Sequence, residues 1–317
     1  MQRRWCGQSG PTTNTVFPDI NRGFRWTFRG RNQQFRVRIL MWLHGYYLAR
    51  PRSSEYSVYV MDPFDESIIA AIASQISKYA QQNRLTEIET IDFTAAFVHS
   101  LEYVPDDVST PYDNYPRYPI ETLVHRGGDC EDASILLTSL LQTLDYEVGL
   151  IQVPGHLQVG VVLDSSHSGT YYKFNSRRYY VLEATGSEWA VGEMPPEHKD
   201  TTGTVVSVST TPLLVHRWSA KMKSNDHMFG TASVSNLGTT IAEQGKMLLK
   251  FRTASGSTVG VRTWSLDGTE PGDTRSFEFE LEIDPSSTIR GHARILLNGE
   301  LHDESTCTSS SYDQNSL

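Results

Sequence analysis

Hydrophobic and polar side chains alternate in two short stretches near the start of the chain, residues 35–39 and 56–60. Apolar side chains at every second position are typical of half-buried strands. We therefore expect a small strand-rich segment over residues 25–62. The preceding residues, 1–24, are polar and interrupted by glycine and proline, so we expect an N-terminal arm without a core of its own.

After residue 62 the apolar spacing changes to three or four, the period of a helix with one buried face. Two helices are predicted within residues 68–79 and 93–101, followed by a loop rich in proline, aspartate and tyrosine at residues 104–119. A third helix is expected at residues 133–141, where most of the circumference is apolar. Strands are expected at residues 147–153, 158–163 and 179–182. This order predicts an α+β domain in which a buried helix packs on an antiparallel sheet.

From about residue 228 onward the pattern consists of short alternating stretches separated by glycine, proline and asparagine, with no convincing helix. Such a series predicts a β-sandwich, which we assign to residues 223–303. The last stretch, residues 304–317, is rich in serine and threonine, and we expect it to be disordered.

Length and charge narrow the classes of function. A chain of 317 residues is long enough for two domains. Its net charge of −9 argues against nucleic acid as a partner. No apolar run approaches the ~20 residues of a membrane-spanning helix. The N-terminus lacks the apolar core of a signal peptide, so as written the chain reads as cytoplasmic, or as extracellular or surface-associated if its start is truncated.

The three cysteines, Cys6, Cys130 and Cys307, lack the paired spacings of a zinc site or a disulfide framework. Cys130 is different because it stands where the third helix should begin, with Asp129 as the expected N-cap. The free N–H groups of a first turn favour a thiolate by roughly 1 kcal/mol and can hold an oxyanion. The nearby acidic residues Asp129, Glu131 and Asp132 raise a thiol pKa, so a nucleophilic Cys130 requires a cationic partner.

A histidine later in the chain can supply the cation, and a carboxylate after it can hold the histidine in place. His156 opens a predicted strand, and its imidazole can take the thiol proton. Glu183 closes the next predicted strand and can orient the imidazole. A metal site built from Cys130, His156, Asp132 and Glu183 is the alternative, but the set lacks the spacings typical of zinc ligands, and we expect no metal and no cofactor.

The sequence resembles a known family in several short motifs. They are Gly-Gly-Asp-Cys-Glu-Asp at residues 127–132, Gly-His at 155–156, Tyr-Val-Leu-Glu-Ala-Thr at 180–185 and Tyr-Pro-Ile-Glu-Thr-Leu at 118–123. Their order over residues 62–190 resembles the transglutaminase-like superfamily, especially its archaeal and bacterial branch. The resemblance implies a papain-like catalytic domain at residues 63–222, with Cys130, His156 and Glu183 as a triad that attacks amide carbonyls through an acyl-thioester. Animal transglutaminases have Asp at the position of Glu183, which puts cross-linking in doubt.

The turns at residues 236–238, 271–272 and 298–299 make the C-terminal part similar to the adhesion-type and immunoglobulin-like sandwiches of archaeal surface proteins. We expect this part to be a spacer or to bind a protein partner. Tyr115 and Tyr118 are candidates for an aromatic wall that binds a peptide substrate, although such residues also pack loops.

The combined prediction is a cysteine hydrolase that acts on peptide or side-chain amides of a protein or peptide substrate. The alternatives are a protein cross-linking acyltransferase, an activity like that of peptide N-glycanase, and a non-catalytic binding or scaffold protein.

Overall fold

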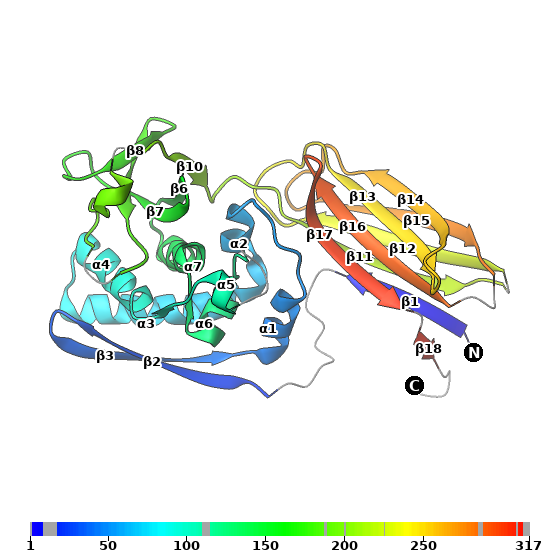
Figure 1. Ribbon diagram of the computed structural model, residues 1–317, viewed down its shortest axis with the longest axis horizontal. Helices are drawn as coiled ribbons and strands as arrows, with labels where there is room; N and C mark the ends of the chain where they lie inside the picture. The colour runs from blue at the N-terminus through cyan, green and yellow to red at the C-terminus, as the bar shows by residue number, and fades with distance from the viewer. Residues whose placement is uncertain are drawn as a thin grey trace. The chain divides into compact units, whose positions relative to one another are not determined.

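The computed structural model describes residues 2–8, 18–109, 115–186, 189–199, 201–224, 226–284, 288–308 and 310–312. The chain forms two compact units. The sandwich unit consists of Met1–Gly10, Arg50–Ser53 and Thr210–Leu317, and the α/β unit of Pro11–Ala49 and Ser54–Ser209 (Figure 1). Among the described residues, no helix has the length and apolar character needed to cross a membrane.

The α/β unit is built around helix α7, Cys130–Thr143. The helices α3, Glu66–Asn83, and α4, Glu87–Val98, pack against it from one side, and strands β6 and β7 from the other. Every residue of α7 from Ser134 to Leu141 is buried. A helix that is apolar around its circumference needs neighbours on all sides. The predicted buried helix and the two helices before it are confirmed.

Five antiparallel strands form the sheet of this unit, in the order β10-β6-β7-β9-β8. Their bounds are β6 Val148–Val153, β7 His156–Val162, β8 Tyr171–Phe174, β9 Arg177–Leu182 and β10 Thr204–Ser207. A two-residue turn joins β6 to β7, and Gly155 adopts a φ of +72° there, a conformation that favours glycine. The three strands predicted before residue 185 are confirmed, and their antiparallel pairing makes the unit a mixed α and β structure.

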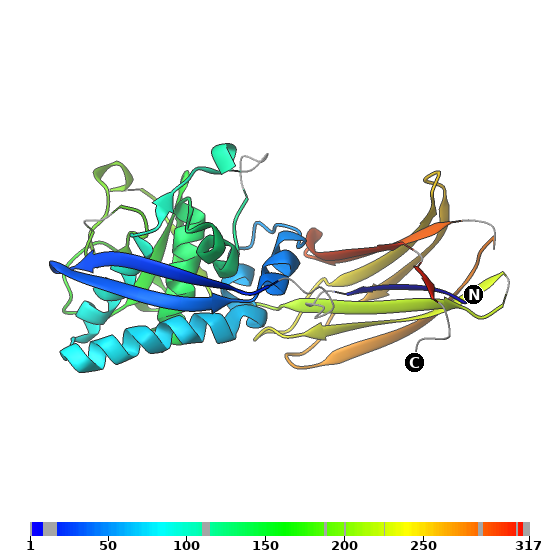
Figure 2. The same ribbon diagram turned by 90° about the horizontal axis from the view of Figure 1, so that it is seen from below.

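A long hairpin covers α3 and α4, formed by β2, Ile20–Phe28, and β3, Arg31–Ile39 (Figure 2). Its buried face carries six apolar residues, and Trp26 and Phe35 pack with Phe93 and Phe97 at centroid distances of 5.3–6.2 Å. Each such side chain contributes about 1.5–3 kcal/mol on burial. The six residues are Phe24, Trp26, Phe28, Phe35, Val37 and Ile39.

The prediction for residues 25–62 is only partly correct. Residues 35–39 are strand, but the alternating residues 56–60 lie almost entirely in helix α2, Ser57–Met61. Ser57, Val58, Tyr59 and Val60 are all buried, so the segment shows no exposed face to fix its period. Helix α1, Met41–Leu48, precedes it. Strand β2 also begins inside the predicted arm, because pairing with β3 and contact with α4 provide a core that residues 20–24 alone lack.

Short elements complete the α/β unit. They are η1 Pro63–Asp65, β4 Glu102–Tyr103, α5 Asp106–Ser109, α6 Pro119–His125, β5 Gly127–Gly128 and η2 Pro196–His198. Strand β4 pairs in parallel with β5, which leads directly to α7. Residues 110–114 of the predicted loop lie outside the described residues.

The sandwich unit contains two antiparallel sheets, ordered β15-β12-β11-β1-β18 and β14-β13-β16-β17. The first sheet comprises β1 Gln2–Gln8, β11 Leu214–Met222, β12 His227–Asn236, β15 Thr274–Glu282 and β18 Ser310–Tyr312. The second comprises β13 Lys246–Thr253, β14 Thr258–Ser265, β16 Ile289–Leu297 and β17 Glu300–Thr308. Trp218, Phe251 and Phe279 lie in the core between them.

The predicted limits of the sandwich, residues 223–303, are too narrow. Strand β11 belongs to the first sheet although we assigned it to the catalytic domain, and β1 lies within the predicted arm. Strand β17 continues into the tail that we expected to be disordered, and β18 follows it. Strands β1 and β18 pair with strands far away in the chain, which local composition does not reveal, whereas β17 pairs with the preceding strand β16. Residues 9–17, 309 and 313–317 lie outside the described residues.

A polar network lies inside the sandwich unit. His216 Nδ1 is 2.8 Å from Asp303 Oδ2, and His216 Nε2 is 2.7 Å from Ser305 Oγ. Beside it the backbone N–H of Leu214 donates to His302 Nε2 at 3.0 Å. This nitrogen therefore carries no proton, and the imidazole is neutral. Burial lowers the pKa of His302 to about 4, against the weaker opposite effect of the Asp303 carboxylate.

We predict that this network makes the sandwich unit sensitive to acid. The pKa of His302 is 6.5 in the unfolded chain and about 4 in the folded one, so its contribution is complete above pH 6.5 and is lost as the pH falls toward 4. The full loss is about 3 kcal/mol. Urea unfolding of the full chain, measured between pH 7 and 4, should therefore depend less on pH in His302→Gln than in the wild type. Equal pH dependence of the two proteins would contradict this prediction.

Candidate active site

Helix α7 begins at Cys130, and Asp129 is its N-cap. The Asp129 side chain accepts from the Asp132 N–H, and the Asp132 side chain accepts from the Asp129 N–H, both at 3.4 Å. This is the capping box expected from the sequence. Cys130 is only 8% exposed. Its sulfur therefore lies in the first turn of a fixed helix, near the free N–H groups.

The two glycines before Asp129 allow the backbone to pass close to Glu102 and Asp132 just before helix α7 begins. A Cβ on Gly128 would lie 2.5 Å from Cβ of Asp132, and one on Gly127 would lie 2.5 Å from the Glu102 carbonyl oxygen. Neither distance is compatible with a side chain. The Gly-Gly pair is thus required by close packing of β5 against β4 and of Asp132 against the turn.

A buried arginine fixes Asp132 in turn. The Arg117 N–H donates to Asp132 Oδ1 at 2.7 Å, its guanidinium contacts Asp132 Oδ2, and its Nη2 lies 3.7 Å from Asp106 Oδ1. Arg117 is 4% exposed and Asp132 is fully buried. A buried charge needs such pairing. Neither Arg117 nor Asp106 was among the predicted site residues, because nothing in the loop pattern marks an arginine as buried.

The thiol of Cys130 donates to Glu131 Oε2 at 2.9 Å. Burial raises the pKa of this thiol well above its usual range, the charge and hydrogen bond of Glu131 raise it further, and a hydrogen bond with the Leu157 backbone opposes them. Burial, with the carboxylates of Asp132 and Glu131, also raises the pKa of Asp129 to about 8. The resting state holds a protonated thiol, and the helix terminus alone does not produce a thiolate.

His156 and Glu183 lie together. Nε2 of His156 is 2.9 Å from Oε2 of the fully buried Glu183, and the His156 side chain is 10% exposed. The pairing follows from topology, because His156 opens β7 and Glu183 directly follows the neighbouring strand β9. Burial pushes the pKa of Glu183 upward, but the hydrogen bond and charge of His156 and the bonds from Thr185 outweigh it and hold the pKa at about 2.

Three further side chains surround this pair. Gln158 Nε2 donates to Glu183 Oε2 at 3.0 Å, His99 Nε2 is 2.8 Å from the Glu183 carbonyl oxygen, and the His198 ring stacks on His156 at 4.4 Å between centroids and 5° between planes. Gln158 shares a face of β7 with His156, so strand periodicity contains a signal for it. No such signal exists for His99 or His198, which belong to other elements.

The backbone of Leu157 connects the two halves of the site. Its carbonyl oxygen accepts from Ser134 Oγ at 2.9 Å, one turn beyond Cys130. The Leu157 backbone also lowers the pKa of the Cys130 thiol, although burial and Glu131 outweigh this effect. The residue next to His156 is thus tied to helix α7. In the described part of the chain, the thiol hydrogen bond of Cys130 goes to Glu131 and not to His156.

The two tyrosines proposed as substrate-binding residues lie elsewhere. Tyr118 is 1% exposed, stacks on Tyr47 at a centroid distance of 4.4 Å and packs against the tilted ring of Tyr59 at 4.6 Å. The expectation of a substrate contact is therefore wrong for Tyr118, whose ring fills the core. Tyr115 is partly buried and its hydroxyl donates to Glu121 Oε1 at 3.4 Å. Its predicted role in substrate binding stays a prediction.

Comparisons with protein-family models and with curated proteins found no match. Among solved structures, the chain is similar to a putative beta-galactosidase from Bacteroides fragilis, with 16% identity and a TM-score of 0.24, over 50% of this chain and 28% of that one. It is similar to beta-glucosidase 3B from Thermotoga neapolitana, with 11% identity and a TM-score of 0.22, over 34% and 16% of the two chains. The chain thus spans less than a third of each of these two proteins.

A further likeness is to red sea bream transglutaminase, with 11% identity and a TM-score of 0.27, over 92% of this chain and 61% of that one. All three TM-scores are too low to support a shared function. The functional argument therefore rests on the geometry of the site.

We predict that Gly128→Ala destabilises the α/β unit by about 2 kcal/mol or more, because the added carbon displaces the buried Asp132 side chain. Gly45→Ala is the matched control, since a Cβ at Gly45 meets nothing within 4 Å and alanine favours helix α1. Thermal unfolding followed by circular dichroism measures both variants. Equal stability of the two would show that the glycine is not required.

Proposed function

We propose that the chain is a cysteine hydrolase of the transglutaminase-like, papain-like type that cleaves peptide or side-chain amides through an acyl-thioester on Cys130. One observation carries the proposal: a histidine bonded to a buried carboxylate at 2.9 Å, on a strand whose next residue accepts a hydrogen bond from Ser134 of the cysteine helix. A histidine with a purely structural role needs neither a buried carboxylate as its partner nor a position beside the cysteine helix.

The identity of the bonded nitrogen supports a catalytic role. Because Nε2 of His156 bonds to Glu183, Nδ1 is the nitrogen available to accept a proton. Glu183 stays ionised with a pKa of about 2, so it holds the ring orientation and stabilises an imidazolium. His198 stacks flat on the same ring and limits its rotation.

The reaction then follows from these groups. The Cys130 proton moves to His156 Nδ1, and the sulfur attacks the amide carbon to form a tetrahedral intermediate. The free N–H groups at the start of α7 stabilise its oxyanion. His156 returns the proton to the departing amine or ammonia, and the thioester remains. Water, deprotonated by His156, attacks the thioester and releases the acid and the free thiol.

In the proposed reaction Glu131 opposes the activation of the thiol. As the hydrogen-bond acceptor of the resting thiol, it competes with His156 for the proton. The thiol must therefore turn away from Glu131 before the reaction starts. This competition gives a resting enzyme of low nucleophilicity, because the thiolate is the reactive form.

We predict that Cys130→Ala abolishes hydrolysis while the fold persists. Denatured casein serves as substrate, new N-termini report peptide cleavage, and ammonia reports side-chain cleavage. Circular dichroism monitors the fold. A fluorescent primary amine, added in a parallel assay, distinguishes water from an amine as acceptor, and its incorporation would identify a cross-linking acyltransferase instead. Hydrolysis by Cys130→Ala at the wild-type rate would exclude Cys130 as the nucleophile.

We predict that Glu131→Gln makes the thiol more reactive, because after burial the charge and hydrogen bond of Glu131 are the main causes of its raised pKa. The pH profile of iodoacetamide modification, mapped to Cys130 by mass spectrometry, should shift by about one pH unit or more to lower pH. Glu243→Gln, an exposed residue of the sandwich unit, is the charge-matched control. Identical profiles for both variants would show that Glu131 does not control the thiol.

A further inference from the structure

The β2–β3 hairpin has a charge opposite to that of the whole chain. Residues 20–39 contain six arginines and neither aspartate nor glutamate, whereas the net charge of the chain is −9. Two of the arginines are neutralised, since Arg29 pairs with Glu89 and Arg38 with Asp19. For Arg25 and Arg36, the described residues provide no ion pair.

The register of the hairpin places these two arginines on one face. Gly23 is opposite Arg36, and Arg25 is opposite Gln34. All four are exposed, whereas the alternate residues Phe24 and Phe35 are buried. Diagonal neighbours on adjacent strands are about 7–8 Å apart. The face turned away from the core therefore presents two unpaired guanidinium groups from positions at that separation.

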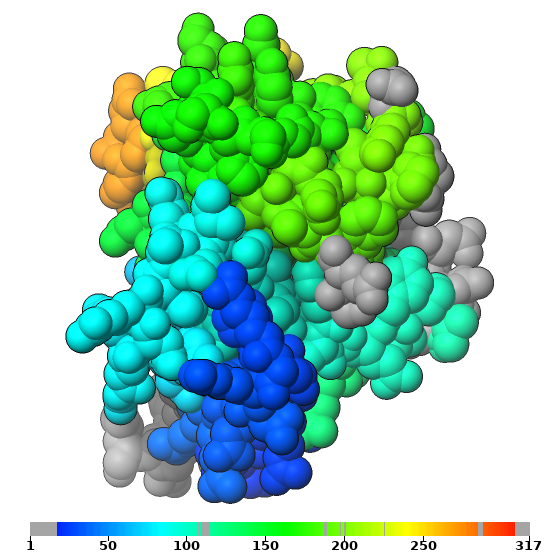
Figure 3. Space-filling view, turned by 90° about the vertical axis from the view of Figure 1, so that its left-hand side faces the viewer, coloured from blue at the N-terminus to red at the C-terminus, as the bar shows by residue number. Residues whose placement is uncertain are grey.

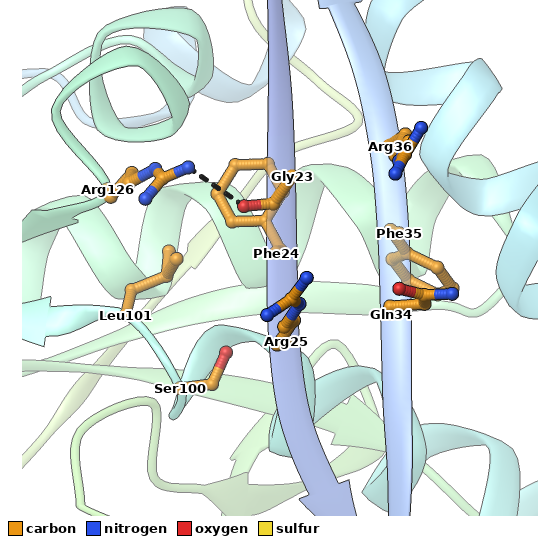
Figure 4. A pocket seen from close by; sticks show the side chains of 9 residues that line it. All are labelled: Gly23, Phe24, Arg25, Gln34, Phe35, Arg36, Ser100, Leu101 and Arg126. Carbon is orange, nitrogen blue, oxygen red and sulfur yellow. Dashed lines mark hydrogen bonds between the residues drawn. The ribbon is translucent and has the colours of Figure 1, made fainter.

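A third arginine joins them beside a hollow of about 460 Å³, which these residues line together with Ser100 and Leu101 (Figure 4). Arg126 Nη2 donates to the Gly23 carbonyl oxygen at 2.9 Å, and its guanidinium carbon lies 5.9 Å from the centre of the Phe24 ring. These contacts hold Arg126 in place. The space above Gly23 is open, because a Cβ there would meet nothing within 4 Å.

The position of the hairpin leaves this face accessible. In Figure 3, which views the α/β unit from the end where β2 turns into β3, the hairpin (dark blue) stands out on the surface of the unit. Arg25 and Arg36 lie on neighbouring strands in Figure 4, with Arg126 beside β2. The three cations come from two separate parts of the chain, the hairpin and the C-terminal end of α6.

We propose that this face, defined by Arg25, Arg36, Arg126 and Gln34, binds an extended acidic peptide segment through its carboxylates. Arginine binds carboxylates with two parallel hydrogen bonds, and unpaired cations in an acidic protein are complementary to an acidic partner. In an extended peptide, alternate side chains share one face and lie about 6.5–7 Å apart. That repeat matches the separation of Arg25 and Arg36, so the preferred segment has Asp or Glu at every second position.

The test measures binding of a fluorescein-labelled peptide of alternating Glu and Ser by fluorescence anisotropy at low salt. The full-length Cys130→Ala variant is used, so that binding is recorded without cleavage and independently of the proposed hydrolase activity. The double variant Arg25→Gln/Arg36→Gln should bind at least tenfold more weakly. Arg217→Gln/Arg290→Gln, which removes two exposed arginines of the sandwich unit, is the charge-matched control and should bind like the parent.

Circular dichroism checks the fold of each variant. Equal affinity of the parent and the hairpin double variant would overturn the proposal, and so would an equal loss in the control. Displacement of the peptide by millimolar inorganic phosphate would identify a phosphate site instead. Stronger binding of a single-stranded oligonucleotide than of the peptide, lost in the hairpin variant, would identify a nucleic-acid surface and would equally overturn it.

Discussion

The buried carboxylate of Asp132 is the interaction on which the geometry of the candidate site depends. One side chain accepts hydrogen bonds from the Asp129 and Arg117 backbones and contacts the Arg117 guanidinium. It thereby closes the capping box that starts α7 at Cys130 and anchors the segment that precedes α6. Because the group is fully buried, its charge is tolerable only while these donors are in place. The start of the helix, the Gly-Gly turn and the arginine therefore form one cooperative unit.

Two other carboxylates have opposite effects on the formation of a thiolate–imidazolium pair. Glu131 bonds to the thiol and favours its protonated form, whereas Glu183 bonds to His156 and favours an imidazolium. A thiolate–imidazolium pair is thus supported on the histidine side and opposed on the cysteine side. Which form prevails depends on the direction of one thiol hydrogen bond.

The sequence was sufficient for features that depend on local order. The capping box at Asp129 and Asp132, the buried helix α7 and the strands that position His156 and Glu183 could all be predicted, since each depends on residues a few positions apart or on strand periodicity. Features that depend on distant pairing could not. Strands β1 and β18 pair with strands far away in the chain, and Tyr118 looks like a loop aromatic until Tyr47 and Tyr59 are placed around it. His198 and Arg117 were missed for the same reason.

The same distinction explains why the resting thiol was harder to predict than the histidine–carboxylate pair. The position of Glu183 follows from the order of β7 and β9, but the direction of the Cys130 thiol is set by the side chain of Glu131, which no periodic pattern marks as its acceptor. A hydrogen bond to a charged group is worth about 1.5–3 kcal/mol, so the resting bond to Glu131 is a modest barrier. In the proposed mechanism a substrate carbonyl next to the first turn of α7 offsets this barrier, because it gives the N–H groups there an acceptor. The proposed mechanism therefore couples substrate binding and thiol activation through the same helix terminus.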